Sequence, residues 1–374
     1  MNKKTPLVLL TPLLILSNPF EARAEDGNIK LGLSGHMKMY GNYASQDGDV
    51  NAFDILRDTD VTFSGETTLS NGLTVGALMN ADGDGDDGFA VEDSFIYASG
   101  DWGRVSFGME DGAAFLLQVA APSADENVDG METFVNPFNF AATTLATSNF
   151  ESEVSSFGLD YDNDLTAGID KVTYLTPVFS GFQAGVSYTP DVANFSPASR
   201  GTNGNNPDDV LDEFGTAWEA GIRYENSISD TVAYKAGAGY TTVGLEQTNG
   251  ATVLDRQKEW NVGLDFDIGA YGIGAIYTKN NGGMMSGNES ETFVLGVDYT
   301  VGPVKYGASW LNNTHEESAT EDTKADRITA GLVYEYGPGL SFRGSVSHVS
   351  VNAPASVGDD VDGTAITIGT QILF

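Results

Sequence analysis

The main group of candidate functional side chains in this sequence lies in the 57-residue segment 112–168, which carries nine acids and no base. The segment is also rich in Phe, Leu, Ala and Val, so we expect it to pack against the rest of the chain. Carboxylates held opposite amines and guanidinium groups across water create a field that acts on passing ions. The candidate acids for this role are Asp125, Glu126, Asp129 and Glu132.

A second acidic pattern, Asp82-Gly-Asp84-Gly-Asp86, is similar to the start of a calcium-binding loop. Carboxylate oxygens at alternating positions suit calcium, so Ca2+ at the acidic loops is one hypothesis. The pattern lacks Gly at its sixth position and has Asp93 where Glu would close the loop. A flexible acidic turn without an ion is the competing interpretation.

The sequence contains few residue patterns that would support a catalytic function. The chain has no Cys, which excludes a thiol nucleophile and a Cys-ligated metal. Its three His residues are expected apart, with His36 on an inner face, His348 on an outer face and His315 in a loop. No G-x-S-x-G motif accompanies them. We therefore expect that the protein is not an enzyme and needs no cofactor.

The net charge of the chain limits the classes of molecule that it can bind. The formal net charge of the 374 residues is −35, which argues against nucleic acid. Hydrophobic residues make up 41% and aromatic residues 10%, too many for a disordered acidic chain.

The first 24 residues have the features of a secretory signal. Lys3 and Lys4 precede an apolar run from Leu7 to Leu16, and Ala22-Arg23-Ala24 fits a cleavage site. The apolar run is too short to cross a bilayer as a helix. We expect cleavage after Ala24, export to the periplasm, and a single mature domain over 25–374.

Alternating apolar and polar residues predict an all-β protein. We expect sixteen strands, near 28–45, 57–70, 72–82, 92–100, 103–111, 169–177, 180–190, 216–227, 230–244, 258–268, 270–280, 291–301, 303–313, 326–336, 339–352 and 363–374. Tight turns alternate with long connections, which surround 46–56, 83–91, 112–168, 191–215, 245–257, 281–290, 314–325 and 353–362. This alternation predicts an antiparallel transmembrane β-barrel, closed by the last strand against the first.

Alternation also assigns side chains to faces. Nine bases are expected to face the barrel interior: Lys30, Lys38, Arg104, Lys171, Arg223, Lys235, Lys305, Arg327 and Arg343. The other bases of the mature chain are expected in loops or at strand ends. Aromatic residues gather at strand ends on the apolar face, as in the interfacial girdles of membrane barrels: Tyr43, Tyr97, Phe107, Phe182, Tyr188, Tyr240, Trp260, Tyr271, Tyr277, Trp310, Tyr336 and Phe342.

Several stretches resemble the Gram-negative general porins, most closely the alphaproteobacterial type. They are the signal with Ala22-Arg23-Ala24, the opening strand IKLGLSGHMKMYGNY, GRVSFGMED before the acidic segment, KVTYLTPVFSGFQAGVSYTPD after it, and the closing TAITIGTQILF. The resemblance covers the mature chain at the level of architecture. Its most specific parts are FGMED and the Y-x-x-P-x-F-x-G-F-x-x-G-x-S-Y segment.

The resemblance implies an outer-membrane homotrimer of 16-stranded barrels for passive diffusion of small hydrophilic solutes and ions. It implies that 112–168 folds inward as a constriction loop. The run Ala113–Ala121 itself predicts a short helix that Pro122 stops. Residues 28–111 would form the trimer contact, with 83–91 as a latch. Outer-membrane lipid and lipopolysaccharide would surround the barrel, and Phe374 would be the signal that the assembly machinery recognises.

The sequence departs from the family in the Lys and Arg residues that would line the pore opposite the constriction acids. The strands near 72–82 and 92–100 carry no base, which leaves Lys38, Lys171, Arg327 and Arg343 as candidates. The excess of acids predicts a preference for cations. Two alternatives stay open: a substrate-specific outer-membrane channel, and a non-conducting barrel that acts as an adhesin or structural surface protein.

Overall fold

A computed structural model describes residues 22–23, 29–85, 88–124, 135–140, 161–193, 209–248 and 254–374. Among them no helix has the length and apolar character needed to cross a membrane. The only helix in these ranges is the four-residue α1 (Ala113–Leu116), shorter than the expected 113–121.

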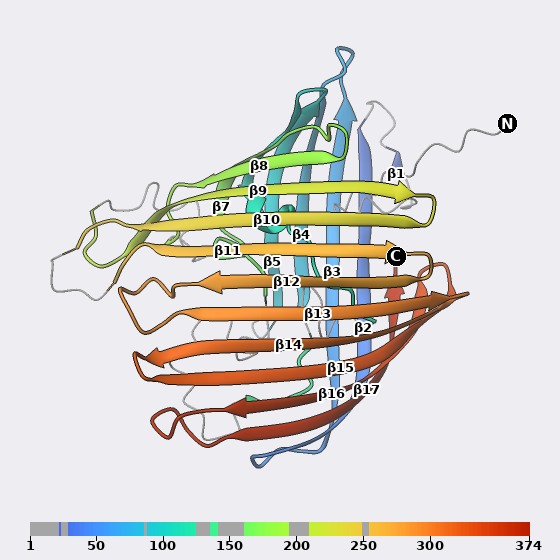
Figure 1. Cartoon of the computed structure of the whole chain (residues 1–374). Coiled ribbons are helices and arrows are strands. Elements are labelled where there is room, and N and C mark those ends of the chain that lie inside the picture. Colours follow the sequence, from blue (N-terminus) through green and yellow to red (C-terminus); the bar gives the residue numbers. More distant parts are fainter. Residues whose placement is uncertain are drawn as a thin grey trace.

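Sixteen antiparallel strands form one closed sheet, as predicted (Figure 1). They are β2 (Lys30–Gln46), β3 (Phe53–Thr68), β4 (Thr74–Gly85), β5 (Gly88–Gly100), β6 (Gly103–Met109), β7 (Asp170–Leu175), β8 (Phe182–Thr189), β9 (Phe214–Ser229), β10 (Val232–Leu245), β11 (Gln257–Ile268), β12 (Tyr271–Asn280), β13 (Ser290–Val301), β14 (Val304–Ser318), β15 (Glu321–Gly337), β16 (Leu340–Asn352) and β17 (Val361–Leu373). A further two-residue strand, β1 (Ala22–Arg23), pairs with the start of β2.

The two ends of the sheet meet along one seam. β17 pairs with β2 from Gly363 and Gln46 to Leu373 and His36. Beyond the seam, the Phe374 amide donates to the Gly35 carbonyl at 3.1 Å, and the Gly35 amide donates to the Phe374 carbonyl at 2.9 Å. The terminal strand therefore leaves no free sheet edge there. In Figure 1, β3 and β4 cross β10–β13 at a steep angle, as expected for tilted strands on opposite walls of a barrel.

Connections are short at one end of the barrel. Turns such as 302–303 and 338–339 place Gly302 and Gly339 at φ +58° and +73°, a backbone region that favours glycine. At the other end two expected long loops are wrong. β4 runs to Gly85 and β5 begins at Gly88, while β14 reaches Ser318 and β15 begins at Glu321. The residues added to β4, β14 and β15 are largely polar or glycine, so they carry no apolar alternation that would have revealed them, whereas β5 gains the apolar residues Phe89, Ala90 and Val91.

The outer face is apolar and carries two levels of aromatic pairs. Toward the long connections Tyr188 packs on Trp218 with ring centroids 4.7 Å apart, and toward the tight turns Tyr271 packs on Tyr299 at the same distance. Tyr97 is an exception to the prediction, because its hydroxyl points inward and donates to Glu66 at 2.6 Å.

Three polar residues lie elsewhere than expected. Arg57 stands within β3 opposite Met39, on the outer face, and Lys324 stands on the outer face of β15. His315 lies within β14, nearly buried, and not in a loop. His36 faces inward and His348 outward, as the alternation predicted.

Candidate functional site

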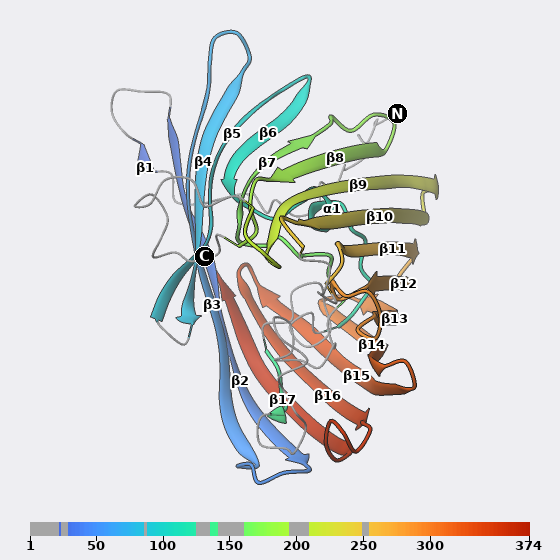
Figure 2. The same cartoon turned by 90° about the vertical axis from the view of Figure 1, so that its left-hand side faces the viewer.

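A row of glycines runs across the inner wall of the barrel from β8 to β14. It consists of Gly185, Gly221, Gly237, Gly239, Gly263, Gly274, Gly296 and Gly307, which we call the glycine belt. Residues 113–124 lie on this belt inside the barrel, with α1 beside β9 and β10 (Figure 2). A side chain at Gly263 would overlap the Val119 carbonyl, and one at Gly296 the Pro122 carbonyl. The missing side chains thus form the groove that holds this stretch.

The seated stretch is apolar and buried. Ala113, Ala114, Leu117, Val119 and Ala121 are each at most 6% exposed. Apolar side chains at these positions gain free energy by leaving water, about 0.8 kcal/mol for each CH2 buried. Packing on the glycine belt therefore stabilises the inward path of residues 113–124.

Gln118 fixes the middle of this stretch by polar contacts and is 1% exposed. Its side-chain amide donates to Asp162 at 2.9 Å, and its side-chain carbonyl accepts from Asn261 of β11 at 2.6 Å. Arg223 of β9 donates to the Gln118 main-chain carbonyl at 2.9 Å. One buried glutamine therefore links the start of the segment, its return and two strands of the wall.

Lys171 on β7 clamps the two ends of the same segment. Its ammonium donates to the Glu110 carbonyl and to the Thr166 carbonyl, the latter at 2.6 Å. Thr166 in turn donates to the Glu219 carboxylate on β9. Lys171 faces inward as predicted, but with 2% exposure it lies beneath the segment. We therefore assign it to anchoring in place of the expected pore wall.

The two carboxyl groups that directly precede the segment have shifted pKa values. Burial raises the pKa of Glu110, and Arg104 and Lys171 oppose the rise. Burial likewise raises the pKa of Asp111, against the attraction of Lys171. Buried acids thus lie around the Lys171 ammonium, whose charge favours their ionised form and opposes the effect of burial.

Lys171→Met is expected to destabilise the barrel by about 3–5 kcal/mol, because it leaves buried acids without their cation. The measurement is the midpoint of heat-induced unfolding in detergent. Lys305→Met is the matched control, since Lys305 faces the same interior but is half-buried and lies 3.6 Å from Asp298. Equal midpoints for the two variants would contradict the anchoring role.

The segment also reaches the opposite wall. Asn42 on β2 donates to the Pro137 carbonyl at 2.8 Å. Gln46 donates to the Asn139 carbonyl and accepts from its amide, both at 2.9 Å. Residues 113–124 lie on β8–β14 while residues 137 and 139 touch β2, so the described parts of the segment contact both sides of the interior.

The basic side chains of the interior are mostly paired with acids. Lys38 lies 2.7 Å from Asp58, Lys235 lies 2.9 Å from Asp265, and Arg223 lies 2.5 Å from Glu225. Arg104 pairs with Glu110 and Lys305 with Asp298. Each such pair is close to neutral as a whole, so the net charge of the wall is set by the remaining charged side chains.

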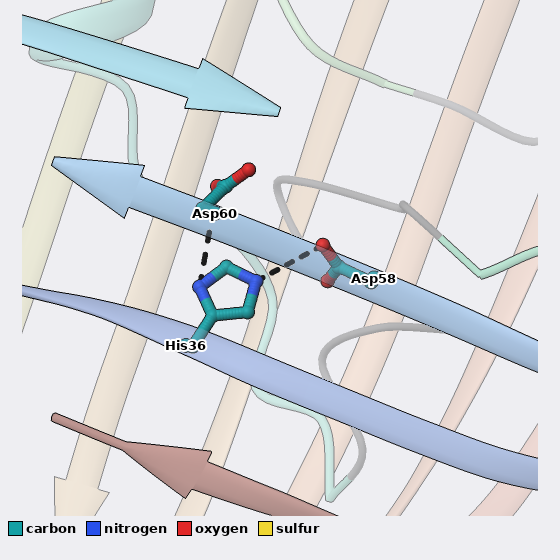
Figure 3. Close-up of side chains that lie close together, drawn as sticks. All are labelled: His36, Asp58 and Asp60. Carbon is teal, nitrogen blue, oxygen red and sulfur yellow. Dashed lines mark hydrogen bonds and ion pairs between the residues drawn. The ribbon is translucent and has the colours of Figure 1, made fainter. Parts of the chain in front are cut away.

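One group of inward side chains combines an imidazole with two carboxylates. His36 on β2 places Nε2 3.0 Å from Asp58 Oδ1 and Nδ1 4.0 Å from Asp60 Oδ2, both on β3 (Figure 3). Asp82 of β4 is the register partner of Asp60. The side chains of His36, Asp58 and Asp60 are 16%, 6% and 18% exposed, so the group borders the lumen.

The other predicted site residues have varied outcomes. Asp125, Glu126, Asp129 and Glu132 lie outside the described residues, as do Asp86 and the side chain of Asp84, so the expected constriction acids and calcium loop stay predictions. Lys38 and Arg327 are 8% and 2% exposed, and Arg343 is half-buried beside Ser341. Lys38 is paired and Arg327 is buried, which leaves Arg343 as the more accessible of these three bases.

Sequence reasoning missed the glycine belt and the His36 group. The glycines were visible in the sequence at alternating positions, but only the register of the barrel brings them into one row. His36, Asp58 and Asp60 were each assignable to an inner face, yet their approach depends on the pairing of His36 with Asp60 in β2 and β3.

Comparison with known proteins places this architecture in a family. A family model for Gram-negative porins matches residues 13–354. The chain is 24% identical over 309 residues to outer membrane porin protein 32 of Delftia acidovorans, covering 80% of this chain and 76% of that protein. It is 25% identical to an uncharacterized protein of Rickettsia conorii, covering 75% and 76% of the two chains.

Among solved structures, an anion-selective porin from Comamonas acidovorans superposes with a TM-score of 0.61 over 92% of this chain and 100% of that one. The sequence identity is 16%, so this likeness concerns the fold alone.

Proposed function

Because the chain belongs to the Gram-negative porin family and is an integral β-barrel of the bacterial outer membrane, we propose that it conducts small hydrophilic solutes and ions by passive diffusion through a cation-preferring pore. We further propose that the segment 112–168 narrows this pore. The observation that carries the proposal is the seating of residues 113–124 on the glycine belt, inside the barrel. A segment that ended as a surface loop would not need that groove.

The paired bases support the cation preference. Five inward bases lie beside carboxylates, while Asp60 and Asp82 add negative charge to the inner face of β3 and β4. Acid-lined pores concentrate cations and exclude anions. The related structure named as anion-selective is too distant in sequence for its selectivity to apply to this chain.

We propose a homotrimer that uses the outer face of β2–β6. Open apolar hollows of ≈ 570 Å³ and ≈ 610 Å³ lie there side by side and share Gly65, Ala77, Ile96 and Phe107. Their shared lining combines the small residues Gly65 and Ala77 with the larger Ile96 and Phe107, a composition suited to packing against a second copy. Arg57 lies on the same outer face of β3, where a second copy would keep its charge away from lipid.

The remaining parts of the proposal concern biogenesis and surroundings. Residues 1–24 are a signal peptide that is removed during export, and Phe374 marks the chain for outer-membrane assembly. Lipid and lipopolysaccharide contact the outer face. The protein performs no catalysis, in keeping with a family and fold of channels.

The test is reconstitution of the mature protein in a planar bilayer. We expect insertions that each add three equal conductance steps, together with sugar-driven swelling of liposomes that fades as the sugar grows larger. A protein that folds and inserts without any conductance would contradict the proposal and favour an adhesin or structural barrel. Swelling restricted to one sugar among several of equal size would favour a substrate-specific channel.

A further inference from the structure

We propose that His36, Asp58 and Asp60 form a binding site for a divalent first-row transition-metal ion, of which Zn2+ is the test case, on the inner wall of the barrel. One ring nitrogen and one oxygen from each carboxylate lie within 4.8 Å of one another. Ligands of a bound zinc ion sit about 2.0–2.2 Å from the metal. Modest side-chain rotations would therefore bring all three donors to one ion.

The side chains converge because of the sheet register. His36 and Asp60 are paired across β2 and β3, and Asp58 is the next inward residue of β3 (Figure 3). Inward neighbours on paired strands lie within reach of each other's side chains. The backbone thus holds the three donors close together before any ion arrives.

The charge around the group favours a divalent cation. Asp58, Asp60 and Asp82 stand together on β3 and β4, and the Lys38 ammonium lies 2.7 Å from Asp58. Asp58 Oδ2 faces Lys38 while Oδ1 faces His36, so the lysine leaves the second oxygen for the ion. A metal ion would offset the acid excess that Lys38 leaves.

The donor set selects the class of ion. Calcium and magnesium prefer oxygen ligands alone, whereas imidazole nitrogen suits zinc, nickel, copper and iron. A set of one nitrogen and two carboxylate oxygens is therefore directed at a transition metal. The partial exposure of His36 and Asp60 leaves positions for water and a path from the lumen.

Isothermal titration calorimetry with ZnCl2 tests the site on the purified mature protein folded in detergent, without any need for conduction. We expect one site per chain for Zn2+ and no heat from MgCl2 at the same concentrations. His36→Ala should weaken binding by at least roughly 100-fold, since loss of an outer hydrogen-bond partner alone costs metal sites 10–100-fold. His348→Ala is the matched control and should bind as the parent does, because His348 lies on the outer face beside Thr364.

A variant that binds Zn2+ more tightly provides a second test. Lys38→Met removes a positive charge beside the site, which should tighten zinc binding about tenfold. Asp60→Asn should weaken binding and serves in place of His36→Ala if that variant fails to fold. Absence of zinc binding in the parent, or equal loss in the His36 and His348 variants, would overturn the proposal whether or not the protein forms a pore.

Discussion

Removal of residues 113–165, which joins Gly112 to Thr166, is expected to raise the single-channel conductance roughly threefold by widening the narrowest part of the pore. The deleted stretch contains α1 and the residues seated on the glycine belt. β6 and β7 keep their pairing from Met109 with Asp170 to Arg104 with Leu175, so the wall stays closed. Single-channel recording in KCl measures the effect.

The control for this deletion is a test that the variant still folds into a barrel. The variant should retain the shift in gel mobility between heated and unheated samples that a folded barrel gives. A folded variant with unchanged conductance would show that the segment does not narrow the pore. A folded variant with no conductance would show that the segment is needed to open a path.

Two glycine-to-alanine substitutions in the glycine belt should loosen the segment 112–168 without shortening it. Gly263→Ala together with Gly296→Ala places a Cβ against the main-chain carbonyls of Val119 and Pro122. Those carbonyls belong to the seated stretch, which must lift from the wall because the strands are held by their hydrogen-bonded neighbours. We expect conductance to rise, roughly to half the gain of the deletion, with increased current noise.

The matched control is Gly344→Ala on the outer face of β16. A Cβ there would lie 3.5 Å from the Thr367 carbonyl, an ordinary contact. Conductance should then equal that of the parent. If the belt variant also matched the parent, with the segment no more accessible to protease, the glycine belt would not be what seats the loop.

The sequence predicted the strand number, the closure and the inner or outer face of most side chains. All three depend on local alternation of apolar and polar residues. In a membrane barrel the outward residues face lipid and are apolar, whereas the inward residues face water and are polar. Expectations failed where that contrast is absent. β4, β14 and β15 extend beyond the expected bounds through residues that are largely polar or glycine, and Arg57 occupies an outer position.

The interior was less predictable than the wall. Lys171 was correctly turned inward, but whether it faces water or lies beneath the segment depends on contacts with Glu110 and Thr166. The glycine belt depends on the register of seven strands, β8 to β14, in which Gly185 lies opposite Gly221 and Gly274 opposite Gly296. Such long-range coincidences have no local signature in the sequence.

The most direct test of the central claim is the reversal potential of the reconstituted protein under a KCl gradient. A cation-preferring pore gives a reversal potential displaced toward the potassium equilibrium potential, and this is the result we predict from an interior whose bases are largely paired with acids. A displacement toward the chloride equilibrium potential would contradict the account of the charged interior, and a bilayer without current would contradict the channel itself.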